Sequence, residues 1–338
     1  MGVLEPGFEH LLALSNHHGT FEHACGTQPR REHGYCTDDM ARVLVVTTRE
    51  PEAGDAVRGL AKVAVRFLDE AQAYLGGCRN RMDHTGAWTD GYAFDDCWGR
   101  CLWGLGTAAA HSDNGLIRRL SVVQFERAAH GRSTWPRAMA FAAIGAAELL
   151  AVEPGNVAAR KLIGDYAADL AAPTGDSAWP WPEPRLSYAN AVLAEAMIAA
   201  GGARDDAALS QRGLELLAWL IEQETIDGHL SPTPVGGWAA GEPRPGFDQQ
   251  PIEVSSLADA CARAAVVDAA ALWPDTVRAA AAWFQGDNDA GAVMWDTATG
   301  GGFDGLHPDG VNLNQGAEST LALLSTFQQA RRFVGVPQ

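Results

Sequence analysis

Residues Gly246–Glu253 read GFDQQPIE, and an apolar helical pattern follows them directly from Val254 to Ala270. Pro251 lies where proline favours the first turn of a helix, because that turn needs no backbone N–H donor from it. The residues before it carry one carboxylate and two side-chain amides. This order predicts a helix start whose polar side chains face a binding surface.

Polar starts of this kind recur before apolar helical segments along the whole chain. Twelve segments show helical periodicity, and the β-branched alternation typical of strands is scarce. The twelve segments cover Glu5–Asn16, Thr37–Arg49, Ala53–Tyr74, Asp95–Ala110, Asn114–Ala129, Trp135–Val152, Val157–Ala171, Ser187–Ala200, Asp205–Glu224, Gln250–Ala270, Pro274–Gln285 and Asn314–Phe333. The even-numbered segments carry less charge after their first turn, which is typical of buried helices. We therefore expect an all-α (α/α)6 toroid of six helical hairpins, with even-numbered helices inside, as one domain over residues 1–338.

The links between these helices are uneven in length. Short links such as Glu50–Glu52 and Glu153–Asn156 lead from even-numbered to odd-numbered helices. Long links rich in Gly, Pro, Trp and Asp lead into five of the even-numbered helices, and they cover His17–Cys36, Leu75–Phe94, Ala172–Leu186, Thr225–Gln249 and Gly286–Leu313. Because long ordered loops usually carry function, we expect a site on the face where the inner helices begin.

Charge and composition exclude several classes of partner. The 338 residues carry a formal net charge of −17 and have a pI of about 4.9. With no basic patch to offset it, this acidity argues against binding to nucleic acid or to an anionic membrane surface. No apolar run reaches the ~18 residues that a membrane span needs, and the first ten residues lack a signal-peptide pattern. The six cysteines form no CxxC pair. We expect a cytoplasmic protein without a membrane span.

Carboxylates at the starts of the even-numbered helices are the candidate catalytic residues. Glycoside hydrolysis needs two carboxyl groups across a cleft, one protonated and one ionised. The candidates are Asp39, Asp96, Asp248, Glu253 and Glu318. In the adjacent pairs Asp38–Asp39 and Asp95–Asp96 the side chains point ~100° apart on a helix, so at most one of each faces the centre. The competing interpretation of each carboxylate is a helix cap or a partner of the helix dipole.

Aromatic, amide and arginine side chains near the same starts are the candidate sugar contacts. Sugar faces stack on aromatic rings, and sugar hydroxyls pair with carboxylates, amides and guanidinium groups. The candidates are Arg31, His33, Tyr35, Asp38, Asp95, Trp98, Arg100, Trp179, Trp181, Tyr188, Asn190, Gln249, Gln250, Asn314 and Gln315, with Trp135 as a further stacking platform. Burial in the core is the competing interpretation for the aromatic residues.

Other chemistries have weaker support in the sequence. A sugar epimerase or isomerase needs a base beside a carbonyl, and His33, His229 and His307 lie in suitable links. The histidines show no HxxxH or HExxH spacing, so we expect no metal ion and no other cofactor. Residues Asp287–Asp289 resemble part of a calcium loop but lack the glycine and the final glutamate of an EF-hand, and rim carboxylates leave a bound calcium open.

Three segments carry a resemblance to a known family. Arg31–Asp39 reads REHGYCTDD, Phe247–Glu253 reads FDQQPIE, and Asp304–Ser319 reads DGLHPDGVNLNQGAES. They resemble a bacterial family of α/α-toroid proteins that are encoded near, or fused to, glycosyltransferases, and the resemblance extends from about Gly19 to Leu324. It implies a toroid fold, a carbohydrate context and a glycosyltransferase as partner. The segment Asp95–Arg100 fits the acidic-pair pattern of the family loosely, because Cys97 and Trp98 depart from it.

Together these observations predict a glycoside hydrolase-like enzyme that acts on an oligosaccharide or glycoconjugate. Within the opening stretch the prediction favours Asp248 over Glu253, because Glu253 falls in the first helical turn, where capping is a sufficient explanation. The alternatives are a sugar epimerase or isomerase, and a non-catalytic glycan-binding partner of a glycosyltransferase. No doubly wound nucleotide-sugar domain is present in the sequence pattern, so the chain is not a self-sufficient glycosyltransferase of the usual kind.

Overall fold

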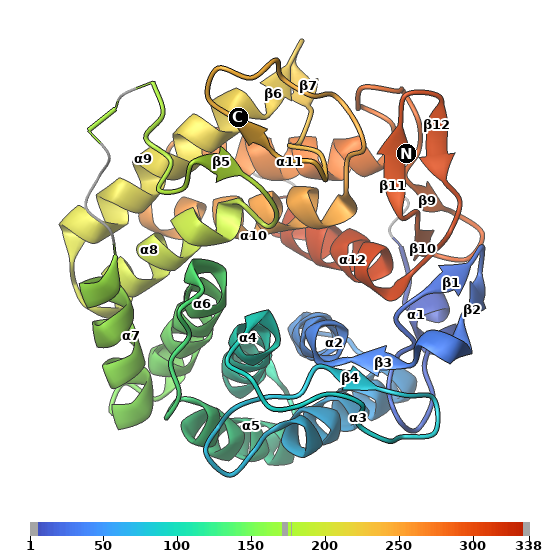
Figure 1. The fold of residues 1–338 in the computed structure, drawn as a ribbon, viewed down its shortest axis with the longest axis vertical. Coiled ribbons are helices and arrows are strands. Elements are labelled where there is room, and N and C mark those ends of the chain that lie inside the picture. The colour runs from blue at the N-terminus through green and yellow to red at the C-terminus, as the bar shows by residue number, and fades with distance from the viewer. Residues whose placement is uncertain (1–5, 171–174, 177, 334–338) are drawn as a thin grey trace.

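The computed structural model describes residues 6–170, 175–176 and 178–333, and helices dominate this part of the chain (Figure 1). Twelve α-helices lie within it, as the sequence predicts. They are α1 Glu9–Ala13, α2 Thr37–Arg49, α3 Asp55–Ala71, α4 Asp96–His111, α5 Gly115–Ala128, α6 Pro136–Val152, α7 Val157–Asp169, α8 Ala191–Ala203, α9 Ala207–Gln223, α10 Pro251–Val267, α11 Leu272–Phe284 and α12 Ala317–Arg331.

The even-numbered helices form a closed inner ring. Helices α2, α4, α6, α8, α10 and α12 contact one another in this order, and α12 returns to contact α2. The odd-numbered helices pack outside them, as Figure 1 shows. Helix α6 illustrates the reason: it consists almost entirely of Ala, Gly, Met, Phe, Ile and Leu and is buried nearly all round. The predicted (α/α)6 toroid with even-numbered inner helices is therefore confirmed.

Every helix except α2 begins or ends at least one residue from its predicted bounds, and side chains explain several of these shifts. Helix α1 ends at Ala13, and the Asn16 side chain accepts hydrogen bonds from His18 and Gly19 in the turn that follows. Helix α3 is shorter at both ends than predicted. Helix α8 starts at Ala191 instead of Ser187, because the Asn190 side chain accepts the backbone N–H of Ser187. Helix α12 starts at Ala317, where Asp304 binds the preceding Gly316 N–H.

The long links contain short antiparallel ribbons that the sequence did not predict. The strands are β1 Ala24–Cys25, β2 Gln28–Pro29, β3 Tyr35–Cys36, β4 Arg81–Met82, β5 Arg185–Leu186, β6 Thr225–Ile226, β7 His229–Leu230, β8 Trp238–Ala239, β9 Trp295–Asp296, β10 Gly301–Gly302, β11 Gly305–His307 and β12 Gly310–Asn312. Strand β3 pairs with β4 and β5 with β8, so links that precede neighbouring inner helices are joined. We call the face that carries these links the link face; the opposite face carries the C-terminal ends of the inner helices.

Glycines allow the inner helices α4 and α6 to approach closely. A Cβ atom added at Gly106 would lie 2.0 Å from the Gly145 carbonyl oxygen, and one added at Gly145 would lie 2.2 Å from the Leu102 carbonyl oxygen. A Cβ at Gly99 would lie 2.2 Å from the Ala138 carbonyl oxygen. Backbone therefore packs on backbone along this crossing, and the arrangement needs residues without a side chain.

Among the described residues, no helix combines the length and the apolar character that crossing a membrane requires.

Candidate functional site on the link face

Arg100 lies at the centre of the candidate site. It stands one turn into α4 and is 5 % exposed, with its guanidinium 4.6 Å from the centre of the Phe141 ring. Its Nε lies 3.5 Å from Asp38 Oδ1, and its Nη2 lies 3.9 Å from Asp96 Oδ2. Within the described residues, Nε and Nη1 of Arg100 and Oδ1 of Asp38 have no hydrogen-bond partner. Buried donors of this kind are costly unless a ligand or water completes them.

Two aromatic side chains flank the acidic pair at the start of α4. The Tyr188 hydroxyl donates a hydrogen bond to Asp96 Oδ2, and the Trp135 indole N–H donates to Asp95 Oδ1 over 3.2 Å. Both rings remain accessible, with Trp135 60 % and Tyr188 43 % exposed. Burial and the bond to Asp96 raise the pKa of Tyr188. Each ring is anchored at its polar end and open on its side, which suits stacking against a sugar.

Arg137 and Glu253 fix the turn that presents Tyr188. Arg137, buried in the first turn of α6, donates to Glu183 over 2.7 Å and to Asn190 Oδ1 over 3.2 Å, and it lies against the Tyr188 ring. Glu253 accepts hydrogen bonds from the backbone N–H of Ala189 and of Asn190 and from the Asn190 side chain. Ala189 has φ +44°, a conformation that a residue with a side chain rarely adopts. Glu253 therefore acts as a positioning residue for this turn.

The pKa of Glu253 predicts a pH dependence of stability. Burial is the main cause that raises this pKa from 4.5 to about 8, and nearby Glu224 adds to it. The unfolded chain ionises Glu253 above pH 4.5 while the folded protein keeps the proton, so stability falls as pH rises towards 8. Between pH 6 and 8 this loss amounts to about 2 kcal/mol, because the folded carboxyl is itself half ionised near pH 8. Urea unfolding at several pH values measures it.

The variant Glu253→Gln provides the control for this pH dependence. It cannot ionise, so much of the fall in unfolding free energy between pH 6 and 8 should disappear. Asp39 also has a raised pKa, of about 6, but its contribution to the pH dependence falls mainly below this window. An unchanged slope in the variant would show that Glu253 is ionised throughout the window.

Arg42 connects two further carboxylates across the ring. Its Nη1 lies 2.6 Å from Asp39 Oδ1 and its Nη2 lies 2.6 Å from Glu318 Oε2. Asp39 is 2 % exposed, and the Cys36 thiol donates to its other oxygen over 3.1 Å. Burial raises the pKa of Asp39 to about 6, opposed by Arg42. The Glu318 side chain is 46 % exposed and open to a ligand. The buried Asp39 instead holds the Arg42 guanidinium in place through their ion pair.

Asp248 faces His307 at the rim of the link face. Asp248 Oδ1 lies 3.9 Å from His307 Nδ1, and about a third of each side chain is exposed. This oxygen accepts no hydrogen bond from the described residues although it is buried. Gln250, next to the start of α10, is also partly exposed. Gln249 is fully buried and donates to Ser231, the Gly246 carbonyl and Asp289, so it is a structural residue and not a sugar contact.

Three predicted aromatic contacts are wrong, because the structure buries them completely. Tyr35 is 0 % exposed and its hydroxyl accepts a hydrogen bond from Asn16. Trp98 is also 0 % exposed, and its indole N–H donates to the Ala128 carbonyl at the end of an outer helix. Trp181 is 0 % exposed and stacks on Trp219 of α9. These rings stabilise the core and cannot stack against a ligand.

Five further predicted contacts have packing or hydrogen-bond partners among the links and the outer helices. Trp179 packs edge-on against Trp219 and Trp238, and Gln315 is buried and bonded to Thr299 and Asp296. The other three are Arg31, which lies over Phe21, His33, which packs on His23, and Asn314, which accepts the Gly26 N–H. Arg31 and His33 are exposed in the 3-10 turn Arg31–His33. These residues shape the links, and Asn190 joins Glu253 in fixing the Tyr188 turn.

The sequence reasoning missed Arg42 and Arg137 as site residues. Together with Arg100 they place one buried arginine in the first two turns of each of three consecutive inner helices. The sequence does contain a signal for them. An arginine near the start of an apolar inner helix is buried there, and a buried arginine needs a carboxylate or a ligand as its partner.

The other histidines and acidic groups offer less to a reaction at this centre. His229 lies 2.8 Å from Asp289, which also accepts from Ser231 and Gln249. One group in the described residues has the spacing to hold a metal ion, and it consists of Glu22, Cys36 and Asp39, with ligand atoms within 4.8 Å of one another. Arginine side chains already pair with both of its carboxylates, Arg81 with Glu22 and Arg42 with Asp39.

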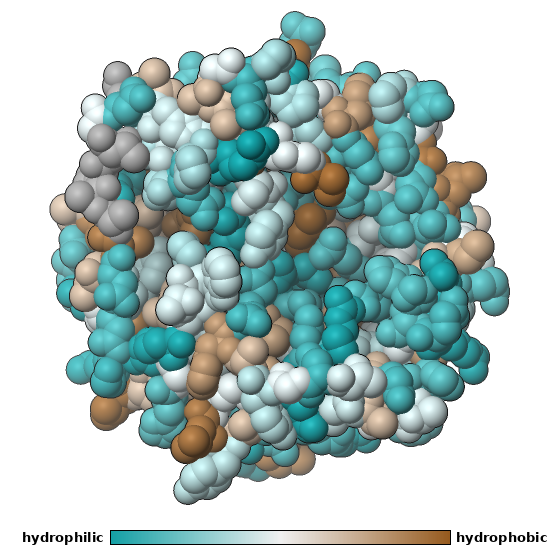
Figure 2. Space-filling model, in the orientation of Figure 1, coloured by the Kyte–Doolittle hydropathy of each residue, from teal (hydrophilic) through white to brown (hydrophobic). Residues whose placement is uncertain are grey.

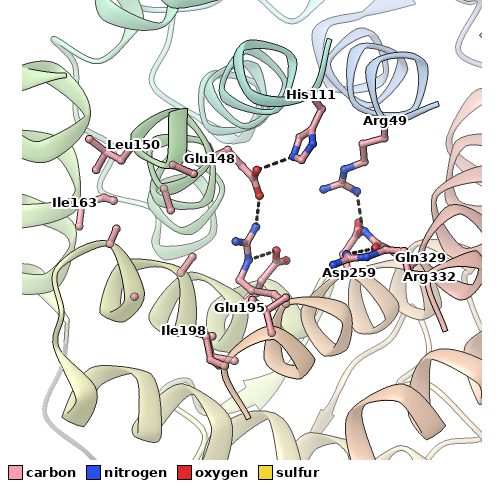
Figure 3. Close-up of a pocket in the computed structure, with 18 of the residues that line it drawn as sticks. Arg49, His111, Glu148, Leu150, Ile163, Glu195, Ile198, Asp259, Gln329 and Arg332 are labelled. Atoms are coloured by element: carbon pink, nitrogen blue, oxygen red, sulfur yellow. Dashed lines mark hydrogen bonds and ion pairs between the residues drawn. The ribbon is translucent and has the colours of Figure 1, made fainter. Parts of the chain in front are cut away.

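The molecule is hollowed on both faces of the ring. Figure 2 shows the link face with a hollow near its centre that is lined mostly by hydrophilic residues. A small axial cavity of about 30 Å³ lies beneath, lined by Arg42, Arg100 and Phe141, and it has room for about one water molecule. A cavity of about 1290 Å³ opens on the opposite face (Figure 3). Glu195 and Asp259 line both cavities.

Comparisons with known proteins agree with the fold. No family model matches the chain, and no curated protein matches it by sequence. Solved structures match over nearly its full length. A sugar epimerase from a ruminal bacterium has a TM-score of 0.69 at 14 % identity, with 97 % of this chain and 96 % of that chain covered.

Two further solved structures represent both kinds of sugar chemistry. Cellobiose 2-epimerase from Spirochaeta thermophila has a TM-score of 0.67 at 13 % identity, covering 96 % and 92 % of the two chains. The α-1,6-mannanase GH76A from Salegentibacter has a TM-score of 0.61 at 11 % identity, covering 96 % and 98 %, in a variant made inactive by replacing two aspartates and bound to α-1,6-mannotetraose. The fold is therefore that of (α/α)6 toroids, which include sugar epimerases, isomerases and glycoside hydrolases.

Proposed function

We propose that the chain is a carbohydrate-active enzyme that cleaves a glycosidic bond of an oligosaccharide on its link face. The observation that carries the proposal is Arg100, a buried arginine with two unused donor nitrogens between two partly exposed carboxylates. A water in the small cavity that Arg100 lines can accept from these donors and pass a hydrogen bond on to a sugar hydroxyl, and the open rings of Trp135 and Tyr188 flank the acidic pair Asp95–Asp96. The sugar-processing neighbours on the same fold are consistent with it.

The proposed roles follow from exposure and contacts. The Asp96 carboxylate accepts a hydrogen bond from the Tyr188 hydroxyl and lies 3.9 Å from Arg100 Nη2. Both partners stabilise a negative charge on Asp96, which a base or nucleophile requires. Asp38, Glu318 and Asp248 are the partly exposed carboxyls that could supply the acid. Asp39 and Glu253 are too deeply buried to touch a substrate and act through Arg42 and the Tyr188 turn.

A test for turnover uses a panel of neutral oligosaccharides that includes α-1,6-mannotetraose and cello-oligosaccharides. The proposal predicts shorter products by mass spectrometry and a matching rise in reducing ends. Conversion of a sugar without any change in chain length would contradict hydrolysis and support the second candidate below.

The second candidate is a sugar epimerase, which the contact between Asp248 and His307 favours. A histidine beside a carboxylate can remove a proton next to a sugar carbonyl. Reaction of reducing sugars in heavy water would then place deuterium at that carbon, and hydrolysis would not. A non-catalytic glycan-binding protein predicts binding without either product. The glycosyltransferase partner and the cytoplasmic location that the sequence implies stay predictions.

A further inference from the structure

The cavity on the opposite face has a floor of ion pairs between the inner helices. Arg263 binds Glu148 over 2.6 Å and Glu195 over 2.9 Å, and Arg49 binds Asp259 over 2.7 Å. Figure 3 shows Arg49, Glu148, Glu195 and Asp259 converging from separate helices. With each carboxylate paired, the floor is close to neutral and rigid, and it offers little unpaired charge to a ligand.

The rest of the lining makes the cavity electropositive. Its charged lining residues are Arg49, Arg160, Arg204, Arg263, Arg331, Arg332, Glu148, Glu195, Asp205 and Asp259. Six arginines against four carboxylates leave a formal lining charge of +2, in a chain whose total is −17, and one of the six, Arg331, pairs with Glu50 beside the cavity. In the part of the chain that the structure describes, Arg160, Arg204 and Arg332 form no ion pair with a carboxylate; Arg332 bonds the amide oxygen of Gln329. Partial desolvation and the guanidinium of Arg49 lower the pKa of Arg332, whose side chain is still exposed at the cavity.

One wall of the same cavity is apolar. Leu150, Ile163, Ile198 and Val266 line it. Figure 3 shows Leu150, Ile163 and Ile198 on one side of the cavity, with Arg332 on the other. A ligand that fills this space therefore meets hydrocarbon along one side and guanidinium groups along the other.

We propose that this cavity binds a small phosphorylated molecule with an apolar body. Guanidinium groups pair with phosphate oxygens in a matching fork geometry. A phosphate monoester carries close to two negative charges at neutral pH, so it can pair with more than one of Arg160, Arg204 and Arg332, which a single carboxylate does less well. A cavity of about 1290 Å³ has ample room for a ligand of this size. The site lies apart from Arg100 and Asp96, and its occupancy does not depend on the reaction proposed for the link face.

Calorimetric titration of the full chain with three probes tests this site. The probes are inorganic phosphate, phenyl phosphate and phenol. Phenyl phosphate should bind about 10-fold more tightly than inorganic phosphate, because its ring removes apolar surface from water, and phenol should bind far more weakly than either. Absence of phenyl phosphate binding in the millimolar range, or equal binding of phenol, would overturn the proposal.

Matched variants locate the binding. Arg204→Gln combined with Arg332→Gln removes two exposed charges at the cavity and should weaken phenyl phosphate binding by at least about 10-fold. Arg118→Gln combined with Arg119→Gln removes the same charge from exposed positions on α5 and should leave the affinity within about 2-fold. Equal affinities of the two double variants would contradict the assignment.

Discussion

Replacement of Asp96 by asparagine is expected to lower kcat/KM on a responsive oligosaccharide by about 10³-fold, the range typical of a lost acid–base group. Asp96 is partly exposed, accepts a hydrogen bond from the Tyr188 hydroxyl and lies near the Arg100 guanidinium. Asparagine keeps the size of the side chain but loses the negative charge that these donors stabilise. Initial rates over a range of substrate concentrations separate the effect on kcat from the effect on KM.

Asp95→Asn is the matched control for this loss. Asp95 is adjacent and exposed, and its side chain bonds the Trp135 indole, a contact that asparagine can keep. We expect a change below about 10-fold, mainly in KM. If both variants retained full hydrolysis, the start of α4 would not hold the reacting carboxylate.

Replacement of Gly106 by alanine is expected to destabilise the protein by about 2 to 3 kcal/mol, through overpacking between α4 and α6. Alanine ordinarily stabilises a helix interior by about 1 kcal/mol relative to glycine, so the expected change has the opposite sign. The cause is the Gly145 carbonyl oxygen, which lies 2.0 Å from the position of the new Cβ and belongs to the backbone. Chemical denaturation measures the change.

Gly59→Ala is the control for this substitution. Gly59 lies within α3, and a Cβ there meets nothing within 4 Å. The variant should gain about 0.5 to 1 kcal/mol in unfolding free energy. If Gly106→Ala were equally stabilising, the close backbone contact between the inner helices would be contradicted.

The sequence predicts the fold well because helical periodicity is local. The observed bounds of α2, Thr37–Arg49, are the predicted ones, and the scarcity of charge on α6 and α8 marks them as inner helices. The ribbons are not predictable in this way. Strand β5 has two residues and exists through its pairing with β8, which lies some fifty residues later in the chain. Such pairings leave no periodic signal.

Part of the candidate site follows from helix phase. Asp96 and Arg100 are four residues apart on α4 and share a face, whereas Trp98 points roughly opposite. The prediction of Trp98 as a sugar contact does not use this phase, and the structure buries the ring completely. The role of Glu253 needed coordinates, because its hydrogen-bond partners Ala189 and Asn190 belong to a link more than sixty residues earlier.

The position of the bound sugar tests the central claim most directly. A crystal structure of the Asp96→Asn variant with the oligosaccharide that the unmodified protein converts would locate it. The proposal predicts a sugar on the link face, with its hydroxyls bonded to Arg100 Nε or Nη1 directly or through one water and a ring against Tyr188 or Trp135. A sugar bound in the cavity of the opposite face, with those two donors of Arg100 still unpaired, would contradict it.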